Sequence, residues 1–395
     1  MLHNNIHIIV GSRLKEYGGG IETWLDYFLY HLLQTNTNVL IYYVESTGGN
    51  LLDKFKDKSN ITQYRSSVEK SKVKSITFVK ETLACLKENI KDGDICLLIG
   101  SIIAGALVVP LRLKYKKTIK ICLWLRELAL NANTKGKKKL IYPVLYLEEK
   151  INMKLADKIF TNGYDTYEYY KQRNKKIIDK FSVIPNAVDY KKYSNLEEAI
   201  SPNCFKIVYI ARLIKERFFG VCEAMSLFYK KYPEYRDKVI CDVWGEGNYI
   251  PSELPPNIIM KGFAKREMIP NILQEANLYF NLLEEESKKI SGGGLSHSLL
   301  EAMACGKLCI STNHPAARQI TDETNGIITE PFNYEQIADT IFEIAKAYFA
   351  NDYEKYKSIS KNARLTAEKY SCEAHMQNFY KNMQELGYIF KLHSN

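Results

Sequence analysis

Short apolar runs alternate with helical stretches along most of this chain, and the alternation occurs in two successive series. Strands that alternate with helices predict parallel sheets covered by helices on both faces. In the first series the predicted strands are Ile6–Gly11, Val39–Val44, Ile95–Ile99, Ile119–Leu123 and Lys158–Thr161. In the second series they are Lys206–Ile210, Val239–Trp244, Ile258–Lys261, Leu278–Leu282 and Leu308–Ser311. The chain is therefore predicted to be an α/β protein with two Rossmann-like, doubly wound domains.

A polar stretch at about residues 195–203 separates the two series and places the expected domain boundary between residues 198 and 199. Residues Tyr334–Tyr370 read as helices and end the second domain, 199–370. The pattern breaks at Tyr370-Ser371 before a last helical stretch at Glu373–Leu386. Residues 371–395 either pack back on the first domain, 1–198, and complete it, or form a helix pair at the C-terminal surface.

Charge and cysteine content restrict the class of protein. A net charge of +10 favours encounters with polyanions or anionic lipid surfaces. No helix-turn-helix, zinc-finger or RNP-like pattern accompanies it, so no nucleic-acid partner is expected. The nine cysteines form no CxxC pair and mostly lie in apolar runs, which indicates small buried residues in a reducing compartment. The N-terminus lacks a signal-peptide pattern, and a cytoplasmic protein is expected.

Two segments resemble features of other protein classes. Ile95–Leu111 carries no charge over seventeen residues, but glycine and proline interrupt it. A buried strand followed by a packed helix is expected there instead of a membrane span. Asp92-Gly93-Asp94 resembles an Asp-x-Asp metal motif, but it precedes a strand, where Asp-Gly is common in turns. No metal site is therefore predicted.

A glycine run follows the first predicted strand, at Gly18-Gly19-Gly20, and leads into a helix. Glycine lets backbone N–H groups approach a ligand closely, and the start of a helix carries a partial positive charge. Gly19 and Gly20 are therefore candidates for a diphosphate seat, and a flexible turn is the alternative.

The second domain contains cations and a carboxylate in the same kind of position. Arg212 follows the strand Lys206–Ile210, with Arg217 close behind, and guanidinium groups suit a diphosphate because they offer paired donors. A solvated basic loop is the alternative. A second glycine loop, residues 291–294, runs into a helix that carries Glu301 among small and apolar neighbours. A carboxylate in such a setting is usually paired or functional, and it could accept hydrogen bonds from ribose hydroxyls.

Taken in order, these motifs resemble the glycosyltransferases of family four, which have the GT-B fold. The resemblance rests first on GLSHSLLEAMACG at residues 294–306 and ARL at 211–213. It extends over nearly the whole chain through GGGIET, ADKIFTNGYDTYEYY, FSVIPNAVD, VWGEGNY, KGFAKREM and ANLYFNL. It implies two domains facing a central cleft, and retaining transfer of a sugar from a nucleotide diphosphate sugar, with a UDP-sugar favoured. The acceptor would be a glycan or a lipid-linked molecule, and neither a metal nor another cofactor is expected.

The resemblance also implies roles for individual residues. Arg212 and Arg217 would hold the donor diphosphate, and Glu301 would bind the ribose. Gly19 and Gly20 would close on the diphosphate from the other domain. The remaining donor-binding positions that it implies are Gly262, Phe263, Ala264, Gly293, Gly294, Leu295 and Ser296.

The sequence departs from the family pattern on the sugar side. The family usually has a second glutamate eight residues before the one matched by Glu301, where this chain has Gly293. Glu284, Glu285 and Glu286 lie earlier and are expected to be ordinary solvated acids, and the alternative is that they reach into the site from the preceding loop. Where the family often has a histidine, Arg126 or Glu127 would stand on the acceptor or sugar side. These departures leave open a non-catalytic subunit that binds nucleotide or a partner without turnover.

Two basic clusters, Lys114–Lys117 and Lys135–Lys139, fall in the predicted acceptor domain. One interpretation places them against the anionic inner face of the cell membrane, where a lipid-linked acceptor would lie. The other is a solvated lysine-rich surface.

Overall fold

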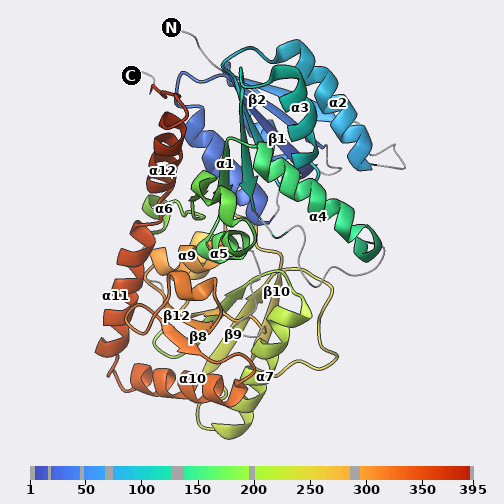
Figure 1. Cartoon of the computed structure of the whole chain (residues 1–395). Coiled ribbons are helices and arrows are strands. Elements are labelled where there is room, and N and C mark those ends of the chain that lie inside the picture. The colour runs from blue at the N-terminus through green and yellow to red at the C-terminus, as the bar shows by residue number, and fades with distance from the viewer. Residues whose placement is uncertain are drawn as a thin grey trace. The chain divides into compact units, whose positions relative to one another are not determined.

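The computed structural model describes residues 5–16, 19–44, 49–66, 74–126, 128, 138–194, 201–284 and 294–391. The chain divides into two compact units (Figure 1). Unit 1 comprises residues 1–186, 291–294 and 373–395, and unit 2 comprises residues 187–290 and 295–372. The division falls after Asn186, ahead of the boundary expected at residue 198, because Tyr193 is buried in the apolar core of unit 2.

Unit 1 is built on a seven-stranded parallel sheet with the strand order β3-β2-β1-β4-β5-β6-β7. Its strands are β1 (Ile6–Arg13), β2 (Val39–Val44), β3 (Ile61–Ser66), β4 (Ile95–Ile99), β5 (Lys120–Leu125), β6 (Lys158–Thr161) and β7 (Phe181–Val183). Its helices are α1 (Gly20–Leu32), η1 (Leu51–Phe55), α2 (Lys74–Asn89), η3 (Gly105–Leu107), α3 (Val108–Tyr115), α4 (Lys138–Leu155), α5 (Tyr164–Arg173), η4 (Lys175–Lys180) and α12 (Cys372–Gln384). The central strands are buried on both faces, which explains their continuous apolar sequences.

Unit 2 has a six-stranded parallel sheet with the order β10-β9-β8-β11-β12-β13. Its strands are β8 (Phe205–Ile210), β9 (Val239–Trp244), β10 (Ile258–Gly262), β11 (Leu278–Asn281), β12 (Leu308–Thr312) and β13 (Ile327–Thr329). Its helices are α6 (Tyr190–Ser194), α7 (Lys215–Lys231), α8 (Ile269–Gln274), α9 (His297–Ala304), η5 (Ala317–Gln319), α10 (Tyr334–Phe349) and α11 (Glu354–Glu368). The prediction of two doubly wound parallel-sheet domains is confirmed.

The last helix, α12, packs from Glu373 onward into the core of unit 1. The Phe379 ring lies 4.9 Å from that of Phe28 on α1. Nε1 of Trp24 donates a hydrogen bond to Nε2 of His375 at 3.3 Å, so the other ring nitrogen, Nδ1, donates to the Pro185 carbonyl oxygen at 2.7 Å. Burial lowers the pKa of His375 to about 3, and this imidazole is therefore neutral in the folded protein.

Acid is expected to destabilise unit 1 through His375. The pKa of His375 is about 6.5 in the unfolded protein and about 3 in the folded protein. The stability that the neutral imidazole contributes to folding is therefore complete above pH 6.5 and is lost as the pH falls toward 3. The loss is about 1.4 kcal/mol per pH unit inside that window. Chemical denaturation from pH 7 to pH 4 measures it. His375→Gln should unfold more easily at pH 7 but show a flatter pH dependence, and an unchanged slope would contradict this assignment.

The uncharged segment Ile95–Leu111 forms strand β4 and then enters η3 and α3, as predicted. None of the helices in the described part of the chain combines the length and the apolar character that crossing a bilayer requires. All nine cysteines are free, and seven are buried, whereas Cys85 and Cys204 are half-buried. Asp94 follows a turn at Gly93 and is engaged within the fold by the Asn5 and Lys91 amides and by His7 at 3.0 Å.

Candidate functional site

The strand order of unit 2 creates a switch point between β8 and β11, because the chain leaves β8 toward one side of the sheet and returns on the other. In parallel sheets of this type, ligands bind at the carboxyl ends of the strands beside such a point. Arg212 lies just after the carboxyl end of β8, and α7 begins at Lys215. Gly262 is the last residue of β10 at the same edge of the sheet.

Backbone hydrogen bonds fix the loops at this edge. The Gly245 amide donates to the Gly262 carbonyl oxygen at 2.8 Å, and the Leu213 amide donates to the Glu246 carbonyl oxygen at 3.0 Å. Gly245 has a φ of +147°, and a Cβ atom there would collide with the Ala211 carbonyl oxygen. The loop that carries Arg212 can therefore lie against the β9 loop only because residue 245 is glycine.

Gly245→Ala is expected to lower the free energy of unfolding of unit 2 by about 3 kcal/mol or more, because backbone strain and a backbone collision add. Thermal melting of the full chain measures it. Gly387→Ala is the matched control, because Gly387 also has a positive φ, +88°, but its Cβ would meet nothing within 4 Å. If both variants melted at the same temperature, close packing at Gly245 would be unimportant.

The side chains of Arg212 and Arg217 are available to bind a ligand. Both side chains are exposed, and neither forms an ion pair with any residue that the structure describes. Arg217 lies in the first turn of α7, where its carbonyl oxygen accepts a hydrogen bond from the Tyr209 hydroxyl at 2.9 Å. The N-terminal end of a helix adds a partial positive charge. This edge of unit 2 can therefore attract an anion.

Glu301 is a buried carboxylate on α9, with 5% of its surface exposed. Burial raises its pKa, while the charge of Arg266, the Tyr193 hydroxyl and the charge of Lys192 oppose the increase. The Arg266 guanidinium is 3.9 Å from the carboxylate, a long contact for an ion pair. The carboxylate oxygens therefore keep the capacity to accept hydrogen bonds from a ligand.

Tyr279 on β11 is a buried tyrosine whose pKa both charges affect. Its hydroxyl donates to the Ile210 carbonyl oxygen at 3.3 Å, at the end of β8. Burial raises the pKa of Tyr279, the Ser298 hydroxyl lowers it, Glu301 raises it and Arg217 lowers it. Both Arg217 and Glu301 thus lie within electrostatic range of one buried hydroxyl. The predicted cation and carboxylate, which are far apart in sequence, therefore both affect the pKa of one buried tyrosine beside the switch point.

The other predicted donor-binding residues of unit 2 differ in exposure. Phe263 is 44% exposed, and Ala264 is half-buried. Leu295 is 2% exposed within the apolar core, which leaves only its backbone to face a ligand. Ser296 caps α9 by accepting a hydrogen bond from the Leu299 amide at 3.3 Å.

Gly294 belongs to unit 1. Its φ of +64° is a backbone conformation that favours glycine. Gly293 and Glu127 lie outside the described residues.

In unit 1, Arg126 lies beside the predicted glycine seat. One Nη2 donor contacts the Asn186 side-chain oxygen at 2.6 Å and the Gly20 carbonyl oxygen at 3.4 Å. The guanidinium carbon is 4.5 Å from the Trp24 ring centroid, and burial lowers the pKa of Arg126 to about 10. Its Nε and Nη1 atoms are buried without a partner among the described residues. Gly19 is exposed, and a Cβ atom there would meet nothing within 4 Å.

Glu284 is not the solvated acid that was expected. It is 8% exposed, accepts a hydrogen bond from the Tyr334 hydroxyl at 2.8 Å, and has a pKa raised by burial. The prediction was wrong because Glu284 begins an acidic run, which is typical of a surface loop, although it lies only three residues after the end of β11. Glu285 and Glu286 lie outside the described residues.

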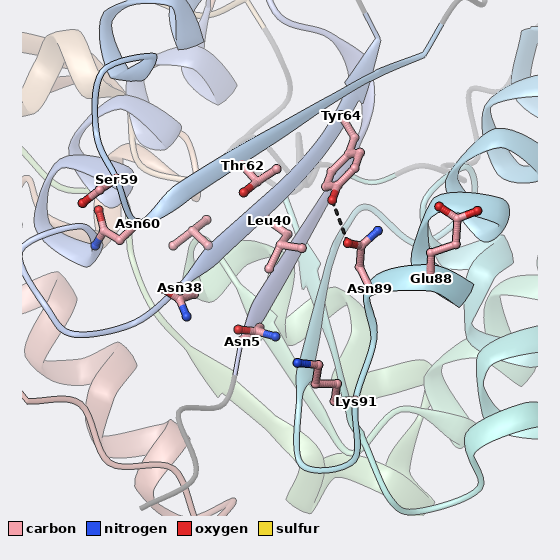
Figure 2. Close-up of a pocket in the computed structure, with 11 residues that line it drawn as sticks. Asn5, Asn38, Leu40, Ser59, Asn60, Thr62, Tyr64, Glu88, Asn89 and Lys91 are labelled. Carbon is pink, nitrogen blue, oxygen red and sulfur yellow. Dashed lines mark hydrogen bonds between the residues drawn. The ribbon is translucent and has the colours of Figure 1, made fainter.

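Unit 1 also has a polar cavity of about 350 Å³, lined in part by Asn5, Asn60 and Asn89 (Figure 2). The Asn89 side-chain oxygen accepts a hydrogen bond from the Tyr64 hydroxyl at 2.8 Å, and Asn60 donates to the Leu33 carbonyl oxygen at 3.1 Å. These amides hold the fold together. The cavity adjoins the amino ends of β1 and β2, opposite the edge where ligands bind in parallel sheets.

The two parallel-sheet Rossmann-like domains define the fold class, because the chain has the GT-B fold of solved glycosyltransferases. Residues 196–366 match the family model described as glycosyl transferases group 1.

The individual likenesses are distant. A poly(glycerol-phosphate) alpha-glucosyltransferase of Bacillus subtilis (strain 168) is 24% identical over 184 residues, which cover 44% of this chain and 25% of that protein. The structure of Anabaena HepE in complex with UDP has a TM-score of 0.70 at 13% identity and covers 96% of this chain and 100% of its own. The pneumococcal O-GlcNAc transferase GtfA in complex with UDP and GlcNAc has a TM-score of 0.69 at 13% identity, over 98% and 100% of the two chains. At such identities the two structures establish the fold alone.

Proposed function

We propose that this chain is a glycosyltransferase that moves a sugar from a nucleotide diphosphate sugar, most readily a UDP-sugar, to a glycan or lipid-linked acceptor. The proposal rests on an exposed cation, Arg217 in the first turn of α7, and a buried carboxylate, Glu301 on α9, which both affect the pKa of Tyr279 beside the switch point of unit 2. A guanidinium suits a diphosphate, and a buried carboxylate suits the hydroxyls of a ribose. The UDP named in the HepE and GtfA structures supports the choice of donor base.

The proposed chemistry is transfer with retention and without a metal. The bond between the anomeric carbon and the diphosphate oxygen breaks, and its electrons remain on the diphosphate. Arg212 and Arg217, with the start of α7, stabilise the charge that accumulates there. The acceptor hydroxyl bonds to the same face of the anomeric carbon and gives its proton to the departing diphosphate. The reaction then requires neither a protein nucleophile nor another cofactor.

The remaining site residues take supporting roles in this proposal. Gly19 and Gly20 would offer amides to the diphosphate, and Arg126 or Glu127 would act on the sugar or acceptor side. In unit 2, the backbone of residues 262–264 lies beside the base, and residues 293–296 face the phosphates and sugar. The enzyme would work in the cytoplasm, at the inner face of the cell membrane, in the assembly of a cell-surface glycan.

A donor panel tests the function. The full chain is incubated with UDP- and GDP-sugars, and release of the nucleotide diphosphate is followed with and without EDTA. We expect turnover with at least one UDP-sugar at a rate that EDTA does not change. Nucleotide binding without turnover on any donor would favour the non-catalytic subunit, whereas loss of activity in EDTA would contradict the metal-free route. The anomeric configuration of the product decides retention.

A further inference from the structure

The outward side of α4 carries a row of exposed apolar side chains. Ile141, Val144, Leu147 and Ile151 are 50%, 69%, 60% and 40% exposed. Their spacing of three or four residues places them on one side of the helix. Single exposed apolar residues are ordinary on protein surfaces, but four on one side of a helix, with only the half-buried Glu148 among them, mark an interaction surface.

The opposite side of α4 is anchored in unit 1, so the row cannot turn inward. The Glu149 carboxylate accepts hydrogen bonds from the Ser101 hydroxyl at 2.6 Å and the Tyr170 hydroxyl at 3.0 Å. Asn152 donates to the Ser101 carbonyl oxygen at 3.1 Å, and Met153 is 1% exposed. The helix is therefore held in one orientation, with a second apolar side that is exposed among the residues that the structure describes.

Lysines border the row. Lys150 and Lys154 are exposed and follow Leu147 and Ile151 by three residues each, which places them next to it. Helix α3 lies beside α4 (Figure 1). Nη2 of Arg112 on α3 donates a hydrogen bond to the Leu155 carbonyl oxygen of α4 at 2.9 Å. The last turn of α3 and the residues just after it add further exposed side chains, namely Leu113, Lys114, Lys116 and Lys117.

We propose that the α4 face, formed by Ile141, Val144, Leu147 and Ile151 with Lys150 and Lys154, lies in the headgroup region of an anionic lipid bilayer. An apolar row bordered by lysines is the pattern of a helix that lies in the plane of a membrane interface. Anionic headgroups complement the lysines, which a purely apolar protein partner would leave unpaired. The inference concerns attachment alone and does not depend on which sugar is transferred.

Vesicle co-sedimentation of the full chain tests the proposal. The vesicles contain phosphatidylcholine with or without phosphatidylglycerol. We expect binding only when phosphatidylglycerol is present, with affinity that falls as salt is added. Leu147→Gln with Ile151→Gln should weaken binding about tenfold or more, because both side chains lose their apolar contact with lipid. Lys150→Glu with Lys154→Glu should abolish the response to phosphatidylglycerol.

Matched variants in unit 2 act as controls. Ile250→Gln with Leu365→Gln replaces an isoleucine and a leucine that are 58% and 50% exposed, and Lys355→Glu with Lys361→Glu removes two exposed lysines of α11. These variants should bind vesicles like the unaltered protein. Equal losses in the two sets, or no binding by the unaltered protein at low salt, would overturn the proposal. A dimer that only the α4 variants convert to a monomer would instead make this face an interface between two copies.

The α4 variants should retain turnover of a soluble donor, because the α4 face contains none of the proposed site residues. A failed vesicle experiment with normal turnover would therefore reject the membrane inference and leave the proposed transferase intact. Normal vesicle binding without turnover would reject the proposed transferase and leave the membrane inference intact.

Discussion

Glu301→Gln is expected to lower kcat/KM for the nucleotide-sugar donor by about 10²–10⁴-fold. The carboxylate would accept two ribose hydroxyls, and each hydrogen bond to a charged group contributes about 1.5–3 kcal/mol. At about 1.4 kcal/mol per factor of ten, the two together account for the stated range. Steady-state kinetics on the donor identified by the panel measures it. Glu343→Gln, at an exposed position on α10, is the control and should keep full activity.

The same variant is expected to melt at a higher temperature than the unaltered protein at pH 7. Burial raises the pKa of Glu301 when the protein is folded, so the folded state disfavours the charged form. The resulting loss of stability is absent below the ordinary glutamate pKa of about 4.3, grows as the pH rises from there toward the raised pKa of the folded state, and is complete above it. The difference in melting temperature should therefore shrink toward pH 4. An active variant, or one that is less stable at pH 7, would contradict the proposed role.

Arg212→Ala and Arg217→Ala are each expected to lower kcat by about 10²–10³-fold, as loss of one preorganised donor to a developing charge does elsewhere. Arg217→Lys should retain more activity, because lysine still supplies a positive charge without the paired donors. The double variant should lose less than the product of the two single losses, since both groups act on one diphosphate. Single-turnover kinetics with saturating donor separates this effect from weaker binding.

Arg236→Ala is the matched control for both arginines, because it removes another exposed arginine of unit 2. All three single variants should unfold within about 0.5 kcal/mol of the unaltered protein, as exposed substitutions usually do. A loss of kcat in Arg236→Ala would show that the effect follows net charge. Full activity in both Arg212→Ala and Arg217→Ala would contradict the proposal that unit 2 binds the donor diphosphate through these two arginines.

Buried parallel strands were the part of the fold that sequence patterns predicted well. Val39–Val44, Ile95–Ile99 and Lys158–Thr161 were predicted with the bounds that the structure has. The strands that were missed are β3, β7 and β13. β3 is a half-exposed edge strand with a polar sequence, and the other two are three residues long. Such strands bury too little apolar surface to leave a pattern, and their neighbours in the sheet specify them instead.

Individual residues of the candidate site could be predicted from the sequence, but the neighbours that set their burial and pKa could not. Arg217 and Glu301 follow from strand ends, a glycine loop and the start of a helix. Arg266 and Tyr193, which modulate the pKa of Glu301, come from elsewhere in the chain. Arg266 stands in the KGFAKREM motif, and that position was the only sequence signal for it. Tyr193 has no such signal, because its contact with Glu301 depends on how α6 packs against α9.

The sequence by itself determined two parallel α/β layers and the glycines and charged groups at strand ends, because these depend on local periodicity and backbone freedom. The tertiary structure alone decided that Glu301 and Glu284 are buried and that the apolar row of α4 faces outward. Hydropathy along a chain reports how apolar a residue is, whereas burial and charge regulation depend on neighbours that are distant in sequence. For that reason an acidic run can hide a buried carboxylate, and an amphipathic helix can keep a second apolar side exposed.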